Sequence, residues 1–539
     1  MNKKLMNKTQ FLAWLLLFNL IIAVPATMAQ KKGNRTEKPK SKLNVLFIVV
    51  DDLRPEFGAY GFKYIHSPNL DRLAQQGVVF DRAYVQQAVC SPSRSSLLTG
   101  TRPDTTKVWD LVTHFRTALP DVVTLPQHFK QNGYFVQGMG KIYHGGYDDP
   151  QSWSVPWSKP KVVTYGLPAN EVRQKASQEE KKDEDEKQQG ARGPAFEAAD
   201  VPDNTFHDGA LADMAIATLR EMAKKNQPFW LGVGFTKPHL PFVAPKKYWD
   251  LYDPAKIALA PNPFRPKGAP EYAILPGNEL LNYQGVPPFP LPDDEARKLK
   301  HGYYAAISYM DAQLGKVFDE LDRLKLRDNT IIVLWGDHGW KLGEHGAWTK
   351  HSNVENDTHA PLMISVPGLK TAGVHSNSLV EFVDVYPTLA ELAGLSLPKH
   401  LEGTSLASLL NHPAESVINA AFSQYPRKKL MGYTMRTDRY RFTKWVDRND
   451  RTKVDAIELY DEVTDPQENV NIANDPKNAE LVKKTDGSVG KRLARSEAKI
   501  MRSSTFLFRS LILVIAVSIG VFSVSAREET SEHHINPCR

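Results

Sequence analysis

Short, nearly continuous apolar runs alternate along this chain with longer segments in which apolar residues recur at helical spacing. Buried strands are predicted at 43–50, 78–85, 228–235, 330–335 and 361–366. Helices are predicted at 69–77, 124–133, 207–225, 293–326 and 380–393. This alternation indicates an α/β domain on a large, mostly parallel sheet.

The pattern changes near residue 420. Short strands with alternating polarity are predicted at 431–436, 440–444 and 456–460, and a loop and a last helix follow at 461–484. We therefore divide the folded part of the chain into a main domain, 43–414, and a smaller α+β subdomain with an antiparallel sheet, 415–499.

Both ends of the chain differ from this folded part. Residues 1–29 have the order of a secretory signal, with lysines before an apolar run and small residues ending at Ala29, so we expect export to a periplasmic or extracellular location. No lipobox cysteine follows that run, and residues 30–42 form a polar linker. Residues 500–539 contain an apolar run, 511–522, that is short for a membrane span. We interpret this tail as a product of gene fusion or readthrough, with a weak anchor as the alternative, and expect no stable membrane span.

Composition adds two limits. The 539 residues are 41% hydrophobic and carry a formal charge of +7, of which the signal contributes three and residues 501–539 one. The remaining charge of about +3 is too weak to indicate nucleic-acid binding, so an anionic substrate must be recognised locally. The two cysteines, Cys90 and Cys538, offer no disulfide framework.

Acidic residues follow two of the predicted strands. Asp51 and Asp52 end the first, and Asp337 and His338 come after 330–335. The carboxyl ends of parallel strands meet at one edge of a sheet, where open α/β sheets bind ligands. Carboxylate oxygens suit calcium or magnesium, and the chain has no zinc motif. For the adjacent pair alone, a helix cap in a solvated turn is an equally good interpretation.

The stretch around Cys90 has the features of an anion site at a helix start. Pro92 suits a first turn and Ser91 could cap it, while Arg94 would share the face of Cys90. A guanidinium and free backbone N–H groups would then converge on the thiol. The alternative is a buried thiol that acts as a small hydrophobic residue.

The residues from Cys90 to Gly100 read Cys-x-Pro-Ser-Arg-x-x-x-Leu-Thr-Gly, and at every fixed position this resembles the signature of the type I sulfatases. Residues 140–144, 237–242 and 336–346 resemble the iduronate-2-sulfatase-like branch of that family. The resemblance extends over about 43–499. It implies an alkaline-phosphatase-like α/β sandwich.

The resemblance also implies the chemistry. A formylglycine-generating maturation enzyme would oxidise Cys90 to formylglycine, whose hydrate is the nucleophile. One Ca²⁺ ion would be bound by the modified Cys90 and by Asp51, Asp52 and Asp337, with His338 at its edge. The nucleophile and the sulfate would be surrounded by Arg94, Lys141, His144, His239 and Lys350. Among these, fixed positive charge would hold the sulfuryl oxygens, His239 would be the acid for the leaving oxygen, and His144 would hold the second hydroxyl of the hydrate.

The expected function is hydrolysis of sulfate monoesters on an extracellular saccharide, with 2-O-sulfated uronic acid residues as the specific candidate. Two alternatives remain open: a phosphodiester or phosphonate monoester hydrolase of the same superfamily, and a binding protein for sulfated glycans whose cysteine is never modified. A charged insertion at 170–200 and a proline-rich stretch at 242–292 are predicted to shape the substrate cleft.

Overall fold

The computed structural model describes residues 42–172 and 192–490, and the described residues from Leu43 onward form one compact unit. The predicted export signal, residues 30–41 of the predicted linker, most of the charged insertion and the tail at 500–539 lie outside the described residues.

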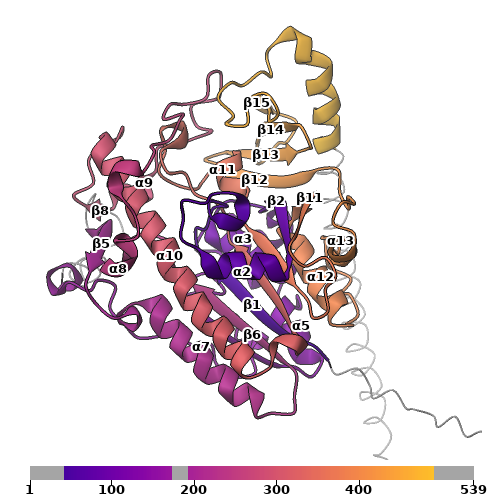
Figure 1. Cartoon of the computed structure of the whole chain (residues 1–539). Coiled ribbons are helices and arrows are strands. Elements are labelled where there is room, and N and C mark those ends of the chain that lie inside the picture. The colour runs from indigo at the N-terminus through magenta and orange to yellow at the C-terminus, as the bar shows by residue number, and fades with distance from the viewer. Residues whose placement is uncertain (1–41, 173–191, 491–539) are drawn as a thin grey trace, which may run out of the picture. The chain divides into compact units, whose positions relative to one another are not determined.

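A central sheet with strand order β11-β2-β10-β9-β1-β6-β3 organises this unit (Figure 1). Its strands are β1 (Asn44–Val50), β2 (Val78–Tyr84), β3 (Phe135–Gly140), β6 (Phe229–Phe235), β9 (Thr330–Gly336), β10 (Leu362–Ser365) and β11 (Val374–Glu381). All neighbours pair in parallel except β10, which is antiparallel to β9 and β2. Every residue of β1, β6 and β9 is buried, which confirms strands covered on both faces.

Helices cover both faces of this sheet. Leu46, Ile48 and Val50 of β1 pack against one set: α2 (Pro68–Gln76), α7 (His207–Ala223) and α10 (Asp293–Arg323). Val45, Phe47 and Val49 pack against the other: α3 (Cys90–Thr99), α5 (Leu125–Gln131), α12 (Val385–Leu392) and α13 (Ala407–Asn411). Alternate β1 side chains thus enter two cores, which gives a three-layer sandwich.

One predicted helix is partly wrong. The segment 380–393 was expected to be helical throughout, but Val380 lies in β11 and the α-helix begins only at Val385. The strand there has a bulge between Ser376 and Leu379 and pairs with β2, so strand pairing overrides the helical spacing of its last residues.

Short strands and helices lie in the segments that connect the main elements. The small strands form two parallel pairs: β4 (Arg192–Pro194) with β8 (Tyr283–Gln284), and β5 (Phe196–Ala199) with β7 (Phe242–Pro245). The short helices are α4 (Pro103–Thr106), α8 (Lys246–Trp249), α9 (Asn278–Leu281) and α11 (Glu355–Thr358). The β4–β8 pair joins the end of the charged insertion to the proline-rich stretch.

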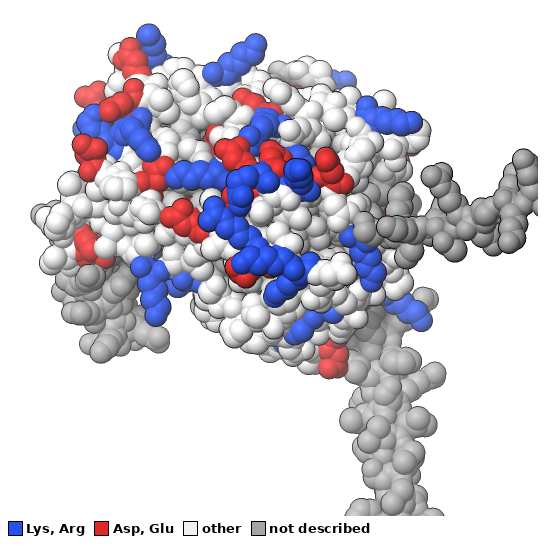
Figure 2. Space-filling model, turned by 60° about the horizontal axis from the view of Figure 1, so that its bottom comes forward, with Lys and Arg blue, Asp and Glu red and all other residues white. Residues whose placement is uncertain are grey.

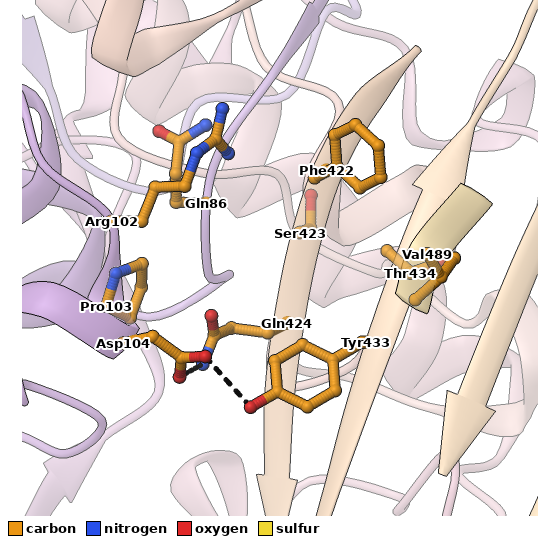
Figure 3. A pocket seen from close by; sticks show the side chains of 10 residues that line it. All are labelled: Gln86, Arg102, Pro103, Asp104, Phe422, Ser423, Gln424, Tyr433, Thr434 and Val489. Carbon is orange, nitrogen blue, oxygen red and sulfur yellow. Dashed lines mark hydrogen bonds between the residues drawn. The ribbon is translucent and has the colours of Figure 1, made fainter. Parts of the chain in front are cut away.

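A second, antiparallel sheet has the order β12 (Ala421–Arg427), β13 (Leu430–Arg436), β14 (Tyr440–Asp447) and β15 (Val454–Asp461), and helical turns follow at 479–490. Three of these strands confirm the predicted ones, whereas β12 was not predicted as a strand. Buried Asp104 connects this sheet to α4, because its carboxylate accepts hydrogen bonds from Gln424 Nε2 and the Tyr433 hydroxyl, each at 3.0 Å (Figure 3).

No helix among the described residues has both the length and the apolar character needed to cross a membrane. On the face shown in Figure 2, a run of lysine and arginine side chains crosses the middle, with aspartate and glutamate side chains beside it. Such mixed charge is expected when the chain between the predicted signal and residue 501 carries a net charge of only about +3.

Candidate active site

Three carboxylates meet at the carboxyl ends of two neighbouring strands. Asp51 and Asp52 follow β1, and Asp337 follows the neighbouring strand β9. The Asp337 N–H donates to Val50 O at 3.1 Å, so the ends of the two strands stay side by side. Asp52 has a φ of 58°, in the left-handed region that aspartate tolerates better than most residues, and its N–H donates to Asp337 Oδ1 at 3.0 Å. All three side chains are buried, and carboxylate oxygens of all three lie within 4.8 Å of one another.

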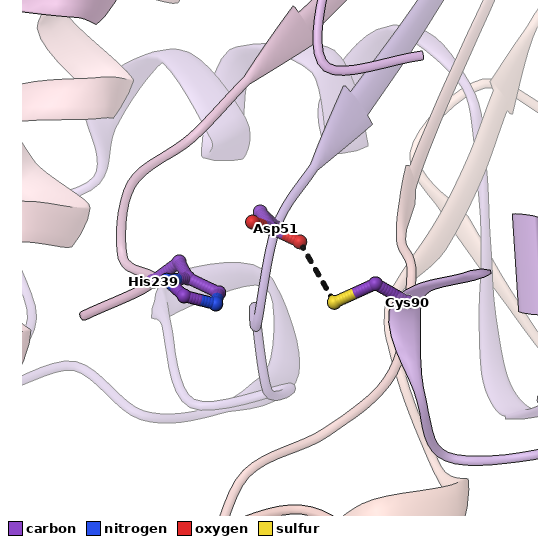
Figure 4. Close-up of side chains that lie close together, drawn as sticks. All are labelled: Asp51, Cys90 and His239. Atoms are coloured by element: carbon purple, nitrogen blue, oxygen red, sulfur yellow. Dashed lines mark hydrogen bonds between the residues drawn. The ribbon is translucent and has the colours of Figure 1, made fainter. Parts of the chain in front are cut away.

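Cys90 is the first residue of α3, as predicted, and its thiol points at these carboxylates. Sγ lies 3.5 Å from Asp51 Oδ1 and 3.2 Å from His338 Nε2. Figure 4 shows Cys90 and His239 on opposite sides of Asp51. The suggested cap at Ser91 is wrong, because the helix starts one residue earlier and Val89 is its N-cap, without a side-chain hydrogen bond.

Arg94 lies one turn further along α3 and is fully buried. Its Nε is 2.9 Å from Asp337 Oδ2 and its Nη2 is 3.0 Å from Asp51 Oδ1, while Nη1 donates to Ile142 O at 3.1 Å. The guanidinium is therefore directed at two of the carboxylates and a backbone carbonyl. It holds those carboxylates in place and compensates their charge.

His338 presents one defined nitrogen to the thiol. Its Nδ1 lies 3.0 Å from Gly339 O, and because a carbonyl only accepts, Nδ1 carries the proton. In the neutral ring Nε2 is then the nitrogen with the lone pair, and it faces Cys90 Sγ, Asp52 Oδ1 at 3.5 Å and Asp337 Oδ2 at 3.7 Å. A backbone partner that fixes the tautomer in this way is typical of a histidine poised to bind a metal ion.

Lys141 reaches the site from the end of β3. Two glycines allow its close approach: Gly140 has a φ of 67°, and a Cβ on Gly234 would lie 2.3 Å from the Lys141 backbone. Its Nζ forms an ion pair with Asp51 and lies 3.7 Å from Cys90 Sγ. Burial lowers the pKa of Lys141, but Asp51 outweighs it and raises that pKa above its ordinary value, so the ammonium stays charged.

Lys350 and His239 lie on the other side of the carboxylates. Lys350 Nζ is 3.0 Å from Asp52 Oδ1 and 3.0 Å from Glu279 Oε2, and it lies over the Trp340 ring. His239 Nε2 is 3.2 Å from Glu279 Oε1 and 3.8 Å from Asp52 Oδ2. Burial raises the pKa of Glu279, but Lys350 and His239 outweigh it and lower that pKa well below its ordinary value. Glu279 is therefore a charged carboxylate of the site.

These groups open into one cavity of about 740 Å³, within the ~300–1,000 Å³ typical of small-ligand sites. Of the predicted catalytic residues, Cys90, Lys141, His144, His239 and Lys350 line it. Arg94 is buried behind them.

Burial, aided by the positive charge of Lys141, lowers the pKa of His144 to about 4, so its ring is neutral near pH 7. Among the described residues nothing hydrogen-bonds its buried Nδ1, which leaves that nitrogen available to a ligand.

The sequence did not identify six residues of the cavity wall: Leu111, Arg192, Glu279, Leu281, Asn282 and His351. Arg192 lies in the charged insertion and three others belong to the proline-rich stretch, so the two segments expected to shape the cleft do contribute to it. The apolar residues of these two segments follow neither helical nor strand spacing, so the sequence could not predict which side chains face the cavity. The available signal was the position of Arg192 and Glu279 in the two segments expected to shape the cleft.

The electrostatics of Cys90 disfavour a thiolate. Burial, with the Asp51 carboxylate adding to its effect, raises the pKa of the thiol well above its ordinary value. The thiolate is the nucleophilic form of cysteine, so an unmodified Cys90 is a weak nucleophile at neutral pH.

The donor set fits a hard divalent cation. Three buried carboxylates with adjacent oxygens repel one another, and burial raises the pKa of Asp52 despite the neighbouring His239 and Lys350. Oxygen donors of this kind suit calcium or magnesium, and His338 Nε2 stands at the edge of the set.

Comparison with protein families gives two matches. The Sulfatase family matches residues 43–395, and the family described as N-sulphoglucosamine sulphohydrolase, C-terminal, matches residues 343–495. The chain is 37% identical over 522 residues to iduronate 2-sulfatase of Mus musculus, covering 82% of this chain and 92% of that protein. It is 36% identical over 531 residues to iduronate 2-sulfatase of Homo sapiens, covering 81% and 92%.

Solved structures share the fold. The phosphonate monoester hydrolase of Agrobacterium radiobacter superimposes with a TM-score of 0.67 at 21% identity, over 84% of this chain and 96% of that one. BT1596, a 2-O GAG sulfatase, superimposes with a TM-score of 0.63 at 22% identity, over 85% and 93%. With the two sheets described above, these likenesses confirm the predicted alkaline-phosphatase-like sandwich.

Proposed function

This chain belongs to the sulfatase family and is a sulfuric ester hydrolase, and from that premise we propose that it removes sulfate from a 2-O-sulfated uronic acid residue of a saccharide, through a formylglycine made from Cys90. The observation that carries the proposal is the convergence of Cys90 with three buried carboxylates, Lys141, Lys350 and His239 at one cavity.

The position of Cys90 supports its conversion. The thiol itself is held in its weakly nucleophilic form, yet the side chain points into the cavity at the start of a helix. A hydrated aldehyde at this position supplies an oxygen nucleophile, and re-formation of the aldehyde supplies a way to release the transferred sulfate that a serine hydroxyl lacks. His144, whose buried Nδ1 is unoccupied by any described residue, is available to hold the second hydroxyl.

Asp51, Asp52 and Asp337, with His338 at the edge, would hold one calcium ion. A cation bound there lowers the pKa of a hydroxyl that contacts it, as it does for bound water. Arg94 donates hydrogen bonds to the carboxylates of Asp51 and Asp337, which holds them in place, so the set is preorganised. Magnesium is the alternative that the donor set allows.

Lys141 and Lys350 are the two lysines that line the cavity, and they are suited to hold the sulfuryl oxygens as negative charge shifts during transfer. His239 is suited to protonate the departing sugar oxygen. Its Nδ1 donates to Leu240 O at 2.6 Å, so the ring is fixed and Nε2 faces the cavity side chains.

The uronic acid assignment is supported by two relatives. The iduronate 2-sulfatases of Mus musculus and Homo sapiens are 37% and 36% identical to this chain and are covered over nearly their whole length. A cavity of about 740 Å³ has room for a sugar ring and part of a neighbour.

The test is sulfate release by purified protein that has been co-expressed with a formylglycine-generating enzyme. A 2-O-sulfated uronic acid disaccharide should lose one sulfate per molecule, and the intact mass should show a loss of about 18 Da at Cys90, the difference between the two side chains. Cys90→Ala serves as the matched control and should be inactive. Full activity in that variant, or an unmodified thiol in an active native protein, would refute the mechanism.

A further inference from the structure

Arg192 brings a guanidinium to the cavity from outside the central sheet. It opens β4, its N–H donates to Asn282 O at 2.9 Å, and it pairs in register with Tyr283 of β8. Both Arg192 and Asn282 line the cavity that contains Cys90. Arg192 is therefore held by the short parallel pair β4–β8. It lines a part of the cavity wall that the ends of the central strands do not form.

Among the cavity residues Arg192 differs from the other cations in lacking a carboxylate partner. Lys141 is paired with Asp51, and Lys350 with Asp52 and Glu279. Within 42–172 and 192–490, Arg192 forms no ion pair. Its side-chain contacts are with the Tyr283 hydroxyl, 3.2 Å from Nη1, and the Tyr283 ring, whose centroid lies 5.3 Å from Cζ. A charge held at a cavity wall by a neutral partner is available to an anion.

The contact with Tyr283 determines which edge of the guanidinium is available. Tyr283 engages Nη1, and in the described parts of the chain neither Nε nor Nη2 has an acceptor. Nε–H and Nη2–H are parallel and lie on one edge of the planar group, which is the arrangement that binds both oxygens of a carboxylate.

We propose that Arg192 determines substrate specificity by binding the carboxylate of the uronic acid whose sulfate is removed at Cys90. This inference rests on the proposed function and deepens it, because it names the second anionic group that the cavity recognises. The paired N–H edge matches the two oxygens of a carboxylate, and because a second sulfate offers two acceptor oxygens as well, the experiment must separate the two anions.

The test compares three substrates in protein with confirmed formylglycine. The first is the 2-O-sulfated uronic acid disaccharide, the second has its carboxyl group reduced to a hydroxymethyl group, and the third has that new hydroxyl sulfated. Wild-type protein should prefer the first, by its kcat/KM, over both others. In Arg192→Met the preference for the first over the second should fall about 10- to 100-fold, as expected for loss of a hydrogen-bonded charge pair.

Arg192→Lys should keep only part of the preference, because an ammonium offers no paired edge. Tyr283→Phe, which keeps the charge but frees Nη1, should weaken the preference less and remains usable if Arg192→Met folds poorly. Arg220→Met is the matched control, since Arg220 is a solvent-exposed arginine of α7 that pairs with Glu320 outside the cavity.

An unchanged preference in Arg192→Met and Arg192→Lys would overturn the inference and leave the proposed function intact. Equal wild-type turnover of the first and third substrates would overturn the carboxylate assignment. Failure of the proposed function gives a different result, since wild-type protein would then release sulfate from none of the three.

Discussion

Glu279 Oε1 lies 3.2 Å from His239 Nε2, while its Oε2 lies 3.0 Å from Lys350 Nζ. One carboxylate from the proline-rich stretch thus joins two cavity residues that follow different strands, β6 and β9. His239 is held from the other side by the hydrogen bond from Nδ1 to Leu240 O. Glu279 therefore acts as a positioning residue for both.

Glu279→Gln should lower kcat/KM about 10-fold or more, because the neutral amide cannot attract His239 and Lys350 together. The measurement is sulfate release at saturating and at low substrate, which separates kcat from KM. Glu271→Gln, an exposed glutamate of the same stretch, is the control and should behave as wild type. Equal activity of the two variants would show that Glu279 has no positioning role.

Much of this site could be predicted because it is built on strand ends. The buried runs at 43–50, 228–235 and 330–335 form neighbouring strands, so the residues that follow them had to meet at one edge. Cys90 at a helix start followed equally from Pro92 and the local pattern. What each residue faces did not follow: Arg94 shares a side of α3 with Cys90, but it is directed at Asp51 and Asp337.

The rest of the cavity wall lies in segments whose apolar residues follow neither helical nor strand spacing. Glu279 and Arg192 reach the cavity through α9 and the β4–β8 pair, and neither element has enough residues for a pattern to define a face. Similarly, β11 could not be separated from the helix after it, because its partner β2 lies about 300 residues earlier in the chain.

Removal of divalent ions should abolish activity, and added Ca²⁺ should restore it. A second measurement is independent of turnover: saturating Ca²⁺ should raise the midpoint of thermal unfolding, since an ion at 100 times its Kd adds about 2.7 kcal/mol to the folded state. Asp52→Asn should reduce that rise, because it removes one of the three buried carboxylates. Asp438→Asn, at an exposed surface carboxylate, should keep the full rise.

Asp104→Ala should destabilise the attachment of the antiparallel sheet. The substitution removes the carboxylate that accepts hydrogen bonds from Gln424 Nε2, the Tyr433 hydroxyl and Arg451 Nη2, and loss of such a buried acceptor costs about 1–3 kcal/mol for each bond. Thermal unfolding should show a lower midpoint, or a separate early transition for residues of β12–β15 in hydrogen exchange. An unchanged midpoint and exchange pattern would contradict the importance of this contact.

His345 should contribute to unfolding in acid. Burial, with the nearby Lys341 charge, lowers its pKa to about 4, and no described residue hydrogen-bonds either ring nitrogen. The unfolded chain binds a proton near the ordinary value of about 6.5. Its contribution to stability is thus complete above pH 6.5 and is lost as the pH falls towards 4, by on the order of 3 kcal/mol. His345→Asn is the suitable variant, because His345 has a φ of 55° and asparagine tolerates that conformation. Urea unfolding at pH 7.5 and pH 5 should show a smaller loss of stability in this variant than in wild type. An equal loss would assign the acid sensitivity to other groups.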